Sequence, residues 1–231
     1  MRRIAIGILA WALLLPAIGV AQDYQAGLNA AANGEYAAAL KEWRPLAEQG
    51  HAQAQYDLGL IFRHGRGVKR DYKQAAKWFR LAAEQGLVAS QYDLGNLYFA
   101  GKGVKQDWAE ALTWFKKAAA QGSAAAKTSL AFMYRYGRGV PPSIGKSLVW
   151  YLDAASQGHA PALDNLGMLY ANGRRVPKDN VQAYKWLTLA AGLGSARGAR
   201  YLKYVTKKMT AAQVSEAKSL ARDWIADFRK R

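Results

Sequence analysis

The sequence predicts an all-α fold, a right-handed superhelical solenoid of stacked antiparallel helix pairs (an α/α superhelix). Glycine recurs at positions 50, 86, 122, 158 and 194, a spacing of 36 residues without an insertion. Each glycine closes a segment whose small and apolar residues fall at helical spacing. A period of this length is typical of tandem helical hairpins that bury their apolar faces against their neighbours. We expect about twelve helices, including both ends of the array.

The chain opens with features of a secretory signal peptide over residues 1–21. Two arginines precede the apolar stretch Ile4–Leu15, and small residues lead up to Ala21. An uncleaved anchor helix is the alternative, but the stretch is short for a span of about 20 residues, and Pro16 interrupts it. We therefore expect cleavage near Ala21, no stable transmembrane anchor, and a mature product in the periplasm or secreted.

Residues 22–50 have the pattern of a tetratricopeptide-like hairpin that caps the array. Asn33 and Gly34 form a dipeptide typical of a tight turn. The apolar stripe of the following helix is Tyr36, Ala39, Leu40, Trp43, Leu46 and Ala47.

Four full copies of the repeat follow over residues 51–194, at 51–86, 87–122, 123–158 and 159–194. The first half of each copy is predicted to form one helix, helix A, and a glycine-containing turn follows it. A residue that can accept from free backbone amides then stands at one shared position and predicts the N-cap of a second helix, helix B. These residues are Asp71, Asp107, Ser143 and Asp179.

Helix B carries an alanine-rich stripe with one tryptophan per copy. In the first two copies the stripe is Ala75, Trp78, Phe79, Ala82 and Ala83, then Ala111, Trp114, Phe115, Ala118 and Ala119. A row of tryptophans is also compatible with stacking on a carbohydrate, but recurrence on the alanine stripe favours core packing.

These residues carry a family resemblance. A leucine-glycine pair, an aromatic, G-x-G-V, an aspartate, then alanine, tryptophan and a closing A-A-x-x-G resemble the Sel-one-like repeat, a branch of the tetratricopeptide superfamily with exported bacterial members. The resemblance covers 51–194 and implies stacked helix pairs. The sequence departs from the family pattern at three positions, Ala131, Ser143 and Arg175. The relatives linked to β-lactam chemistry carry cysteines, and this chain has none.

Residues 195–231 lack the turn motif and are predicted to be C-terminal capping helices. Thr210 and Gln213 form a capping box in front of an amphipathic segment. Such a polar-backed closing helix is what the end of an array requires.

The composition argues against catalysis. The chain has three histidines and no cysteine, and no carboxylates cluster near the histidines. We predict a non-enzymatic protein with no catalytic residue, no cofactor and no metal site. The formal net charge of +17 is compatible with an acidic partner and equally with solubility alone, because the charge is spread along the chain. Nucleic acid is not expected, because export removes the usual targets.

The leading hypothesis is an interaction scaffold or regulator in the bacterial cell envelope that binds another protein, of unknown identity. The columns of helix A that vary between copies are predicted to be exposed and to line the concave face. The candidate residues are Tyr56, Asp57, Leu60, Arg63, Tyr92, Asp93, Asn96, Phe99, Phe132, Arg135, Asn165 and Met168.

The alternative hypothesis is a binder of an anionic envelope polymer or lipid headgroup. One cation per copy lies in or beside the turn glycines, and stacking predicts a basic ladder along one edge. The candidate ladder residues are Arg66, Lys102, Arg138 and Arg174.

Overall fold

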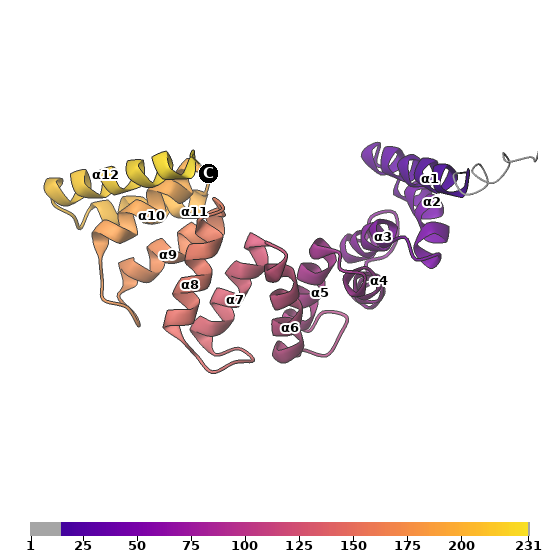
Figure 1. The fold of residues 1–231 in the computed structure, drawn as a ribbon, viewed down its shortest axis with the longest axis horizontal. Helices are drawn as coiled ribbons and strands as arrows, with labels where there is room; N and C mark the ends of the chain where they lie inside the picture. Colours follow the sequence, from indigo (N-terminus) through magenta and orange to yellow (C-terminus); the bar gives the residue numbers. More distant parts are fainter. Residues whose placement is uncertain (1–14, 231) are drawn as a thin grey trace, which may run out of the picture. The chain divides into compact units, whose positions relative to one another are not determined.

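The computed structural model describes residues 15–230. This part of the chain forms twelve α-helices, stacked in consecutive antiparallel pairs (Figure 1). The predicted all-α class and helix-pair architecture are therefore confirmed. The helices are α1 Leu15–Ala32, α2 Tyr36–Glu48, α3 Ala52–His64, α4 Tyr72–Glu84, α5 Val88–Ala100, α6 Trp108–Ala120, α7 Ala124–Tyr136, α8 Ile144–Ala155, α9 Ala160–Asn172, α10 Asn180–Gly192, α11 Ala196–Thr206 and α12 Ala211–Phe228.

The predicted signal peptide falls mostly outside the described residues. Helix α1 begins at Leu15 and continues across Ala21, the expected cleavage position. In the part that the structure describes, no helix combines the length and hydrophobicity of a membrane span.

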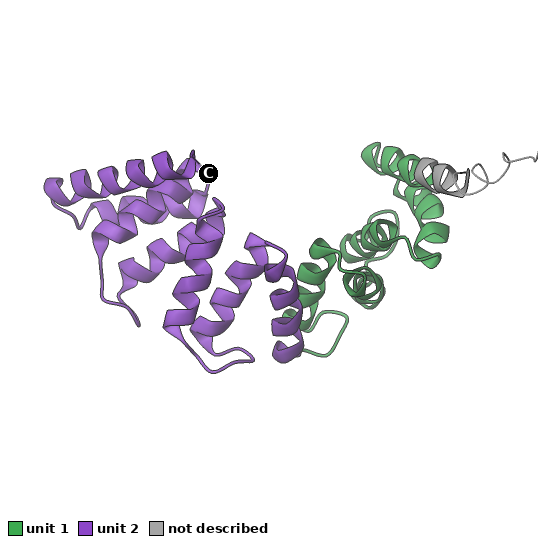
Figure 2. Cartoon of the chain, in the orientation of Figure 1, with its two compact units in different colours: residues 1–106 green, residues 107–231 purple. Residues whose placement is uncertain are grey.

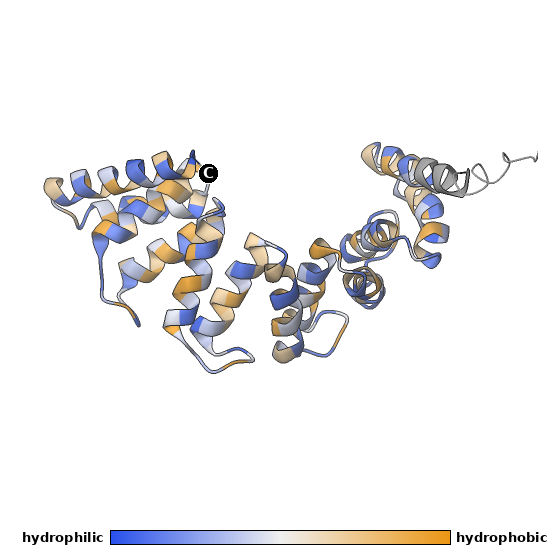
Figure 3. Cartoon of the chain, viewed as in Figure 1, coloured by the Kyte–Doolittle hydropathy of each residue, from blue (hydrophilic) through white to orange (hydrophobic). Residues whose placement is uncertain are grey.

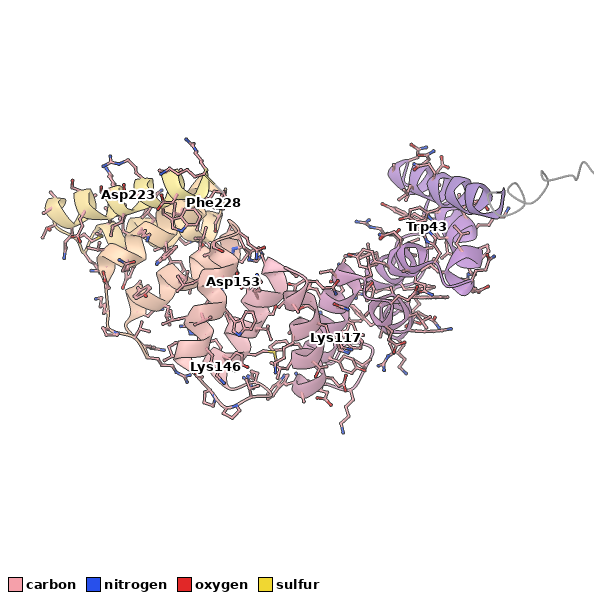
Figure 4. The ribbon with its side chains drawn as sticks, viewed as in Figure 1. Trp43, Lys117, Lys146, Asp153, Asp223 and Phe228 are labelled. Carbon is pink, nitrogen blue, oxygen red and sulfur yellow. The ribbon has the colours of Figure 1, made fainter. Side chains whose placement is uncertain are left out.

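The chain divides into two compact units, residues 1–106 and 107–231, whose boundary falls between α5 and α6 (Figure 2). In the first unit each helix from α1 to α5 contacts the next. Trp43 of α2 packs in an apolar cluster with α3 and α4 (Figure 4), and its indole N–H donates to the Tyr24 carbonyl oxygen of α1 at 3.2 Å. The predicted N-terminal hairpin thus joins the first repeat through a shared core.

In the second unit each helix from α6 to α11 contacts the next, and α12 packs on α10. Hydrophobic and hydrophilic positions alternate along its helices (Figure 3). Tyr151 of α8 and Leu166 of α9 are fully buried in one cluster. Leu187 of α10, Val205 of α11 and Ala217 of α12 lie together in another. Burial against the neighbouring hairpin is the main stabilising contribution in such arrays.

The helix B caps form as predicted. Asp71, Asp107, Ser143 and Asp179 each accept a hydrogen bond from backbone amides in the first turn of α4, α6, α8 and α10. The closing glycines also behave as predicted, since Gly86 follows the end of α4 with φ of 92°. The chain leaves each helix B through this left-handed residue.

A close backbone contact explains why the second position of the turn is glycine in the first three copies. A β-carbon on Gly103 would lie 2.0 Å from the Tyr72 carbonyl oxygen, at the start of the preceding helix B. In the fourth copy Arg175 stands at this position, keeps the left-handed conformation with φ of 73°, and donates to the Arg135 carbonyl oxygen. The turn geometry therefore survives the substitution.

Three of the four column tryptophans are buried as predicted: Trp78, Trp114 and Trp186. Trp150 is half-buried and packs at the edge of the α8–α9 cluster. The column is thus core packing, with one weaker position.

The C-terminal helices also agree with the sequence. Thr210 and Gln213 form the capping box of α12. Ala217 and Ala221 bury its apolar face, while Trp224 stacks on Phe228 with ring centroids 5.0 Å apart (Figure 4).

Candidate partner-binding surface

The candidate binding residues lie on the A helices of the repeats, α3 and α5 in the first unit and α7 and α9 in the second. Most of them are half-buried: Tyr56, Asp57, Leu60, Arg63, Tyr92, Asn96, Phe99, Asn165 and Met168. Phe132 is the most exposed, at 38%. We call this set, with Asp93 and Arg135, the A-helix face.

Two residues of the A-helix face are not exposed, contrary to the prediction. Asp93 is 7% exposed and Arg135 is 9% exposed. Asp93 on α5 accepts from the Arg63 guanidinium of α3 at 2.6 Å and from the Tyr56 hydroxyl at 3.3 Å. Both partners come from the preceding copy, so the carboxylate joins neighbouring A helices.

Two other carboxylates of the A helices also accept hydrogen bonds from neighbouring hairpins. Asp57 on α3 accepts from the Tyr24 hydroxyl of α1 at 2.6 Å. Asp164 on α9 accepts from Ser195 at 2.7 Å and from the Arg197 guanidinium at 3.2 Å. From the sequence, a charged residue at a position that varies between copies is expected to be exposed. In the structure these carboxylates instead take part in the packing between copies.

The buried polar network shifts the pKa values of its members. Burial, and then the neighbouring Asp93, raises the pKa of Tyr56 to about 12. Burial also raises the pKa of Asp57, although the hydrogen bond from Tyr24 opposes this change. The hydrogen bonds of this network join neighbouring copies.

The ladder residues Arg66, Lys102, Arg138 and Arg174 are all exposed, as predicted. Three of them also lie over the first residue of the preceding helix B. Arg66 lies 5.3 Å from the Tyr36 ring centroid, Lys102 5.5 Å from Tyr72, and Arg138 4.3 Å from Trp108. The equivalent position for Arg174 is Ile144, which has no π face. Three of the four ladder cations thus have a structural role, a cation–π contact with the preceding hairpin.

The first unit holds a cavity of about 420 Å³ beside the C-terminal ends of α3 and α5. Residues of the A-helix face and of the ladder line it together. Arg63, Asp93, Asn96 and Phe99 come from the A-helix face, and Lys102 comes from the ladder. The structure therefore brings together two sets of residues that the sequence separates.

Further cavity residues come from outside both sets. His64, Arg70 and Tyr72 also line it. The Tyr72 ring has Arg70 and Lys102 at 5.5 Å each from its centroid. Burial, followed by the charges of Arg63 and Arg66, lowers the pKa of His64. Arg63 and Arg66 thus place positive charge near the imidazole, partly offset by Asp93.

In the second unit, Phe132 of the A-helix face lies beside another aromatic side chain of α7. Phe132 and Tyr136 of α7 have ring centroids 4.5 Å apart, and the Arg135 guanidinium lies 5.2 Å from the Tyr136 centroid. A hollow of about 360 Å³ is lined by Asn172 and α11 residues, including Arg200 and Tyr204. Aromatic and arginine side chains are enriched among residues that dominate protein interfaces.

Comparison with known proteins settles the family. The Sel1 repeat matches residues 52–87, 88–123, 124–159 and 160–195, one residue later than the boundaries we predicted. This chain belongs to the Sel1 repeat family. None of the curated proteins compared with it matches.

Several solved structures resemble this Sel1 repeat chain. A protective antigen of uropathogenic Escherichia coli strains, with an SLR fold, is 29% identical with a TM-score of 0.76 and covers 94% of this chain. This chain spans about half of the antigen, 49% of its length. A Sel1 repeat protein from Oxalobacter formigenes is 26% identical with a TM-score of 0.72, over 87% of this chain and 82% of that one.

An immunity protein from Pseudomonas aeruginosa shares the fold at greater distance. It is 24% identical with a TM-score of 0.52, over 83% of this chain and 73% of that one. This likeness shows a shared helical fold and no shared role.

Proposed function

We propose that this Sel1 repeat protein is a non-enzymatic scaffold or regulator of the bacterial cell envelope that binds another protein on its A-helix face. One observation carries the proposal. The A-helix face lines part of a charged and aromatic cavity in the first unit, and in the second unit its Phe132 contacts Tyr136. Membership of a repeat family supports a role in binding, because repeat arrays act through extended surfaces. The envelope location is supported by the leader pattern in residues 1–21.

The exposed ladder is less well suited to act as a separate binding edge. Three of its four cations are placed over aromatic rings of the preceding hairpin. Exposed cations in such contacts still attract anions, so salt separates the two hypotheses. Binding to a polyanion should fall steeply between low and moderate salt, and a protein contact led by aromatic anchors should lose far less.

Crosslinking in intact cells, with identification of the captured partner, tests the proposal. The variant Tyr92→Ala, Phe99→Ala, Phe132→Ala removes three aromatic side chains of the A-helix face. The matched control, Leu81→Ala, Val149→Ala, Leu152→Ala, removes three exposed apolar side chains from the B helices α4 and α8. We expect the first variant to lose the partner and the control to keep it.

Circular dichroism and urea unfolding of both variants show whether each remains folded. Capture that persists in a folded A-helix variant, or that disappears equally in the control, contradicts the proposed surface. Fractionation of cells that express the full chain tests the envelope location, which a purely cytoplasmic product would contradict.

A further inference from the structure

The cavity beside α3 and α5 has an excess of positive charge. Arg63, Arg70 and Lys102 line it, with Asp93 as the carboxylate. The Asp93 carboxylate lies 2.6 Å from the Arg63 guanidinium, which neutralises it. Neither Arg70 nor Lys102 forms an ion pair among residues 15–230, and the ring contact of each is with Tyr72. Two exposed cations therefore face a cavity without a matching anion.

Apolar and amide groups complete the lining. Phe99 and Ala100 present hydrocarbon surface, and the Asn96 side chain offers both a donor and an acceptor. A volume of about 420 Å³ lies within the range of sites that hold a small group of atoms. Such a lining suits a carboxylate next to an apolar side chain better than a bare inorganic anion, because an inorganic anion makes no favourable contact with the apolar part of the lining.

This combination occurs once among the four copies. The positions equivalent to Arg70 are Gln106, Pro142 and Lys178, and those equivalent to His64 are Ala100, Tyr136 and Asn172. A polymer with regularly repeated charges would need similar sites at regular intervals. A single cavity instead matches a single acidic segment.

We infer that this cavity binds an acidic segment of a partner protein, in which a glutamate or aspartate lies next to an apolar residue. The inference rests on the proposed function and names the chemistry of the partner at that same surface. The carboxylate contacts Arg70 and Lys102, and the apolar side chain packs on Phe99 and Ala100. Charge-assisted hydrogen bonds to a carboxylate are strong enough to select it over the neutral amide.

A pair of short peptides tests the inference on the full chain. The acidic probe is acetylated and amidated Glu-Leu-Glu-Phe-Glu, and its neutral counterpart has glutamine in place of glutamate. Titration calorimetry gives the Kd of each. We expect the neutral peptide to bind at least about tenfold more weakly, since it loses the charge-assisted contacts.

Two double variants show whether the cavity is responsible. Arg70→Gln with Lys102→Gln removes both unpaired cations of the cavity and should raise the Kd of the acidic peptide at least about tenfold. Lys69→Gln with Lys105→Gln removes the same charge from exposed positions in the same turns that do not line the cavity. We expect this control to stay within about twofold of the unchanged chain.

The imidazole of His64 provides a second readout. A bound carboxylate favours the charged imidazolium, so the pKa of His64 should rise when the acidic peptide is added. Arg63, Arg66, Arg70, Lys102 and Asp93 are the charged groups around it. With three histidines in the chain, nuclear magnetic resonance can follow this titration directly.

Three results overturn the inference: no binding of the acidic peptide at millimolar concentration, an equal loss in both double variants, or binding of dextran sulfate at the cavity without binding of the peptide. The last result would identify an anionic polymer as the ligand. If the Arg70→Gln, Lys102→Gln variant still captures the native partner, the inference of an acidic ligand is wrong, while the proposal that the A-helix face binds a partner is not contradicted. Loss of the A-helix face itself is tested separately by the aromatic variant above.

Discussion

Arg63 and Asp93 form an ion pair between two neighbouring copies, with 2.6 Å between Nη1 and Oδ1. Asp93 is nearly buried, while the Arg63 side chain is 28% exposed. The pair links α3 to α5 on a face that the sequence predicts to be free surface. Residues that pack between copies therefore lie on the same columns as the proposed partner-binding surface.

Replacement of Asp93 should show how much this link stabilises the first unit. Asp93→Ala leaves the Tyr56 hydroxyl and the Arg63 guanidinium without their acceptor, and we expect a loss of about 1 to 3 kcal/mol in the free energy of unfolding. Tyr56→Phe is the matched control, because it removes one hydrogen bond and keeps the ion pair, with an expected loss of about 0.5 to 1.5 kcal/mol. Urea unfolding measures both. An Asp93→Ala loss no greater than that of Tyr56→Phe would contradict the role of the pair.

The tryptophan column should be unequal in its contribution to stability. Trp114 is buried and Trp150 is half-buried. Trp114→Ala should lower the free energy of unfolding by about 3 to 5 kcal/mol, because it leaves a cavity between helices. Trp150→Ala should cost less than half as much, since less of its surface leaves water on folding. Chemical unfolding of the two variants decides the order, and equal losses would show that burial does not govern the column.

The ladder offers a test with a built-in control. The Arg138 guanidinium lies 4.3 Å from the Trp108 centroid, whereas Ile144 stands opposite Arg174 in the repeat register. Arg138→Gln should cost about 0.5 to 1 kcal/mol from the lost cation–π contact. Arg174→Gln removes the same charge and should change stability by roughly zero. Thermal or urea unfolding compares them, and a similar effect of both would mean that net charge, not the ring contact, matters.

His159 should contribute to acid sensitivity. Burial disfavours the imidazolium and lowers the pKa of His159, and Nδ1 lies 2.9 Å from the Thr128 hydroxyl. Below the usual histidine pKa the unfolded chain takes up a proton that the folded chain resists, so the free energy of unfolding decreases as the pH falls. His159→Gln should therefore lose less stability than the unchanged chain between about pH 7.5 and about pH 5. Urea unfolding at both pH values measures this, and parallel losses would refute the assignment.

The elements that were predicted well depend on local chemistry. The N-cap at Asp71, the capping box at Thr210 and the left-handed Gly86 each involve groups within a few residues of one another. The stripe of Trp78 and Phe79 follows helical periodicity. Each of these features can be recognised from a short stretch of sequence, so the architecture could be predicted from the repeat alone.

The candidate site was predicted less well, because its contacts join distant copies. Asp93 and Arg135 belong to columns that vary between copies, and variation is typical of exposed positions. The acceptor role of Asp93 depends on Arg63 and Tyr56 in the preceding copy. A signal existed in retrospect, since a tyrosine and an aspartate stand side by side in each of the first two copies at Tyr56-Asp57 and Tyr92-Asp93.

By itself, the sequence determined the repeat, its helix ends and its alanine-tryptophan core, because a period of 36 residues places the same short-range signals in every copy. Only the tertiary structure decided which charged residues are buried between copies and which line a cavity. The physical reason is that burial of a charge depends on whether a partner of opposite sign lies within reach in space. Arg63 has such a partner in Asp93, whereas Arg70 and Lys102, in the same cavity, have none among the residues that the structure describes.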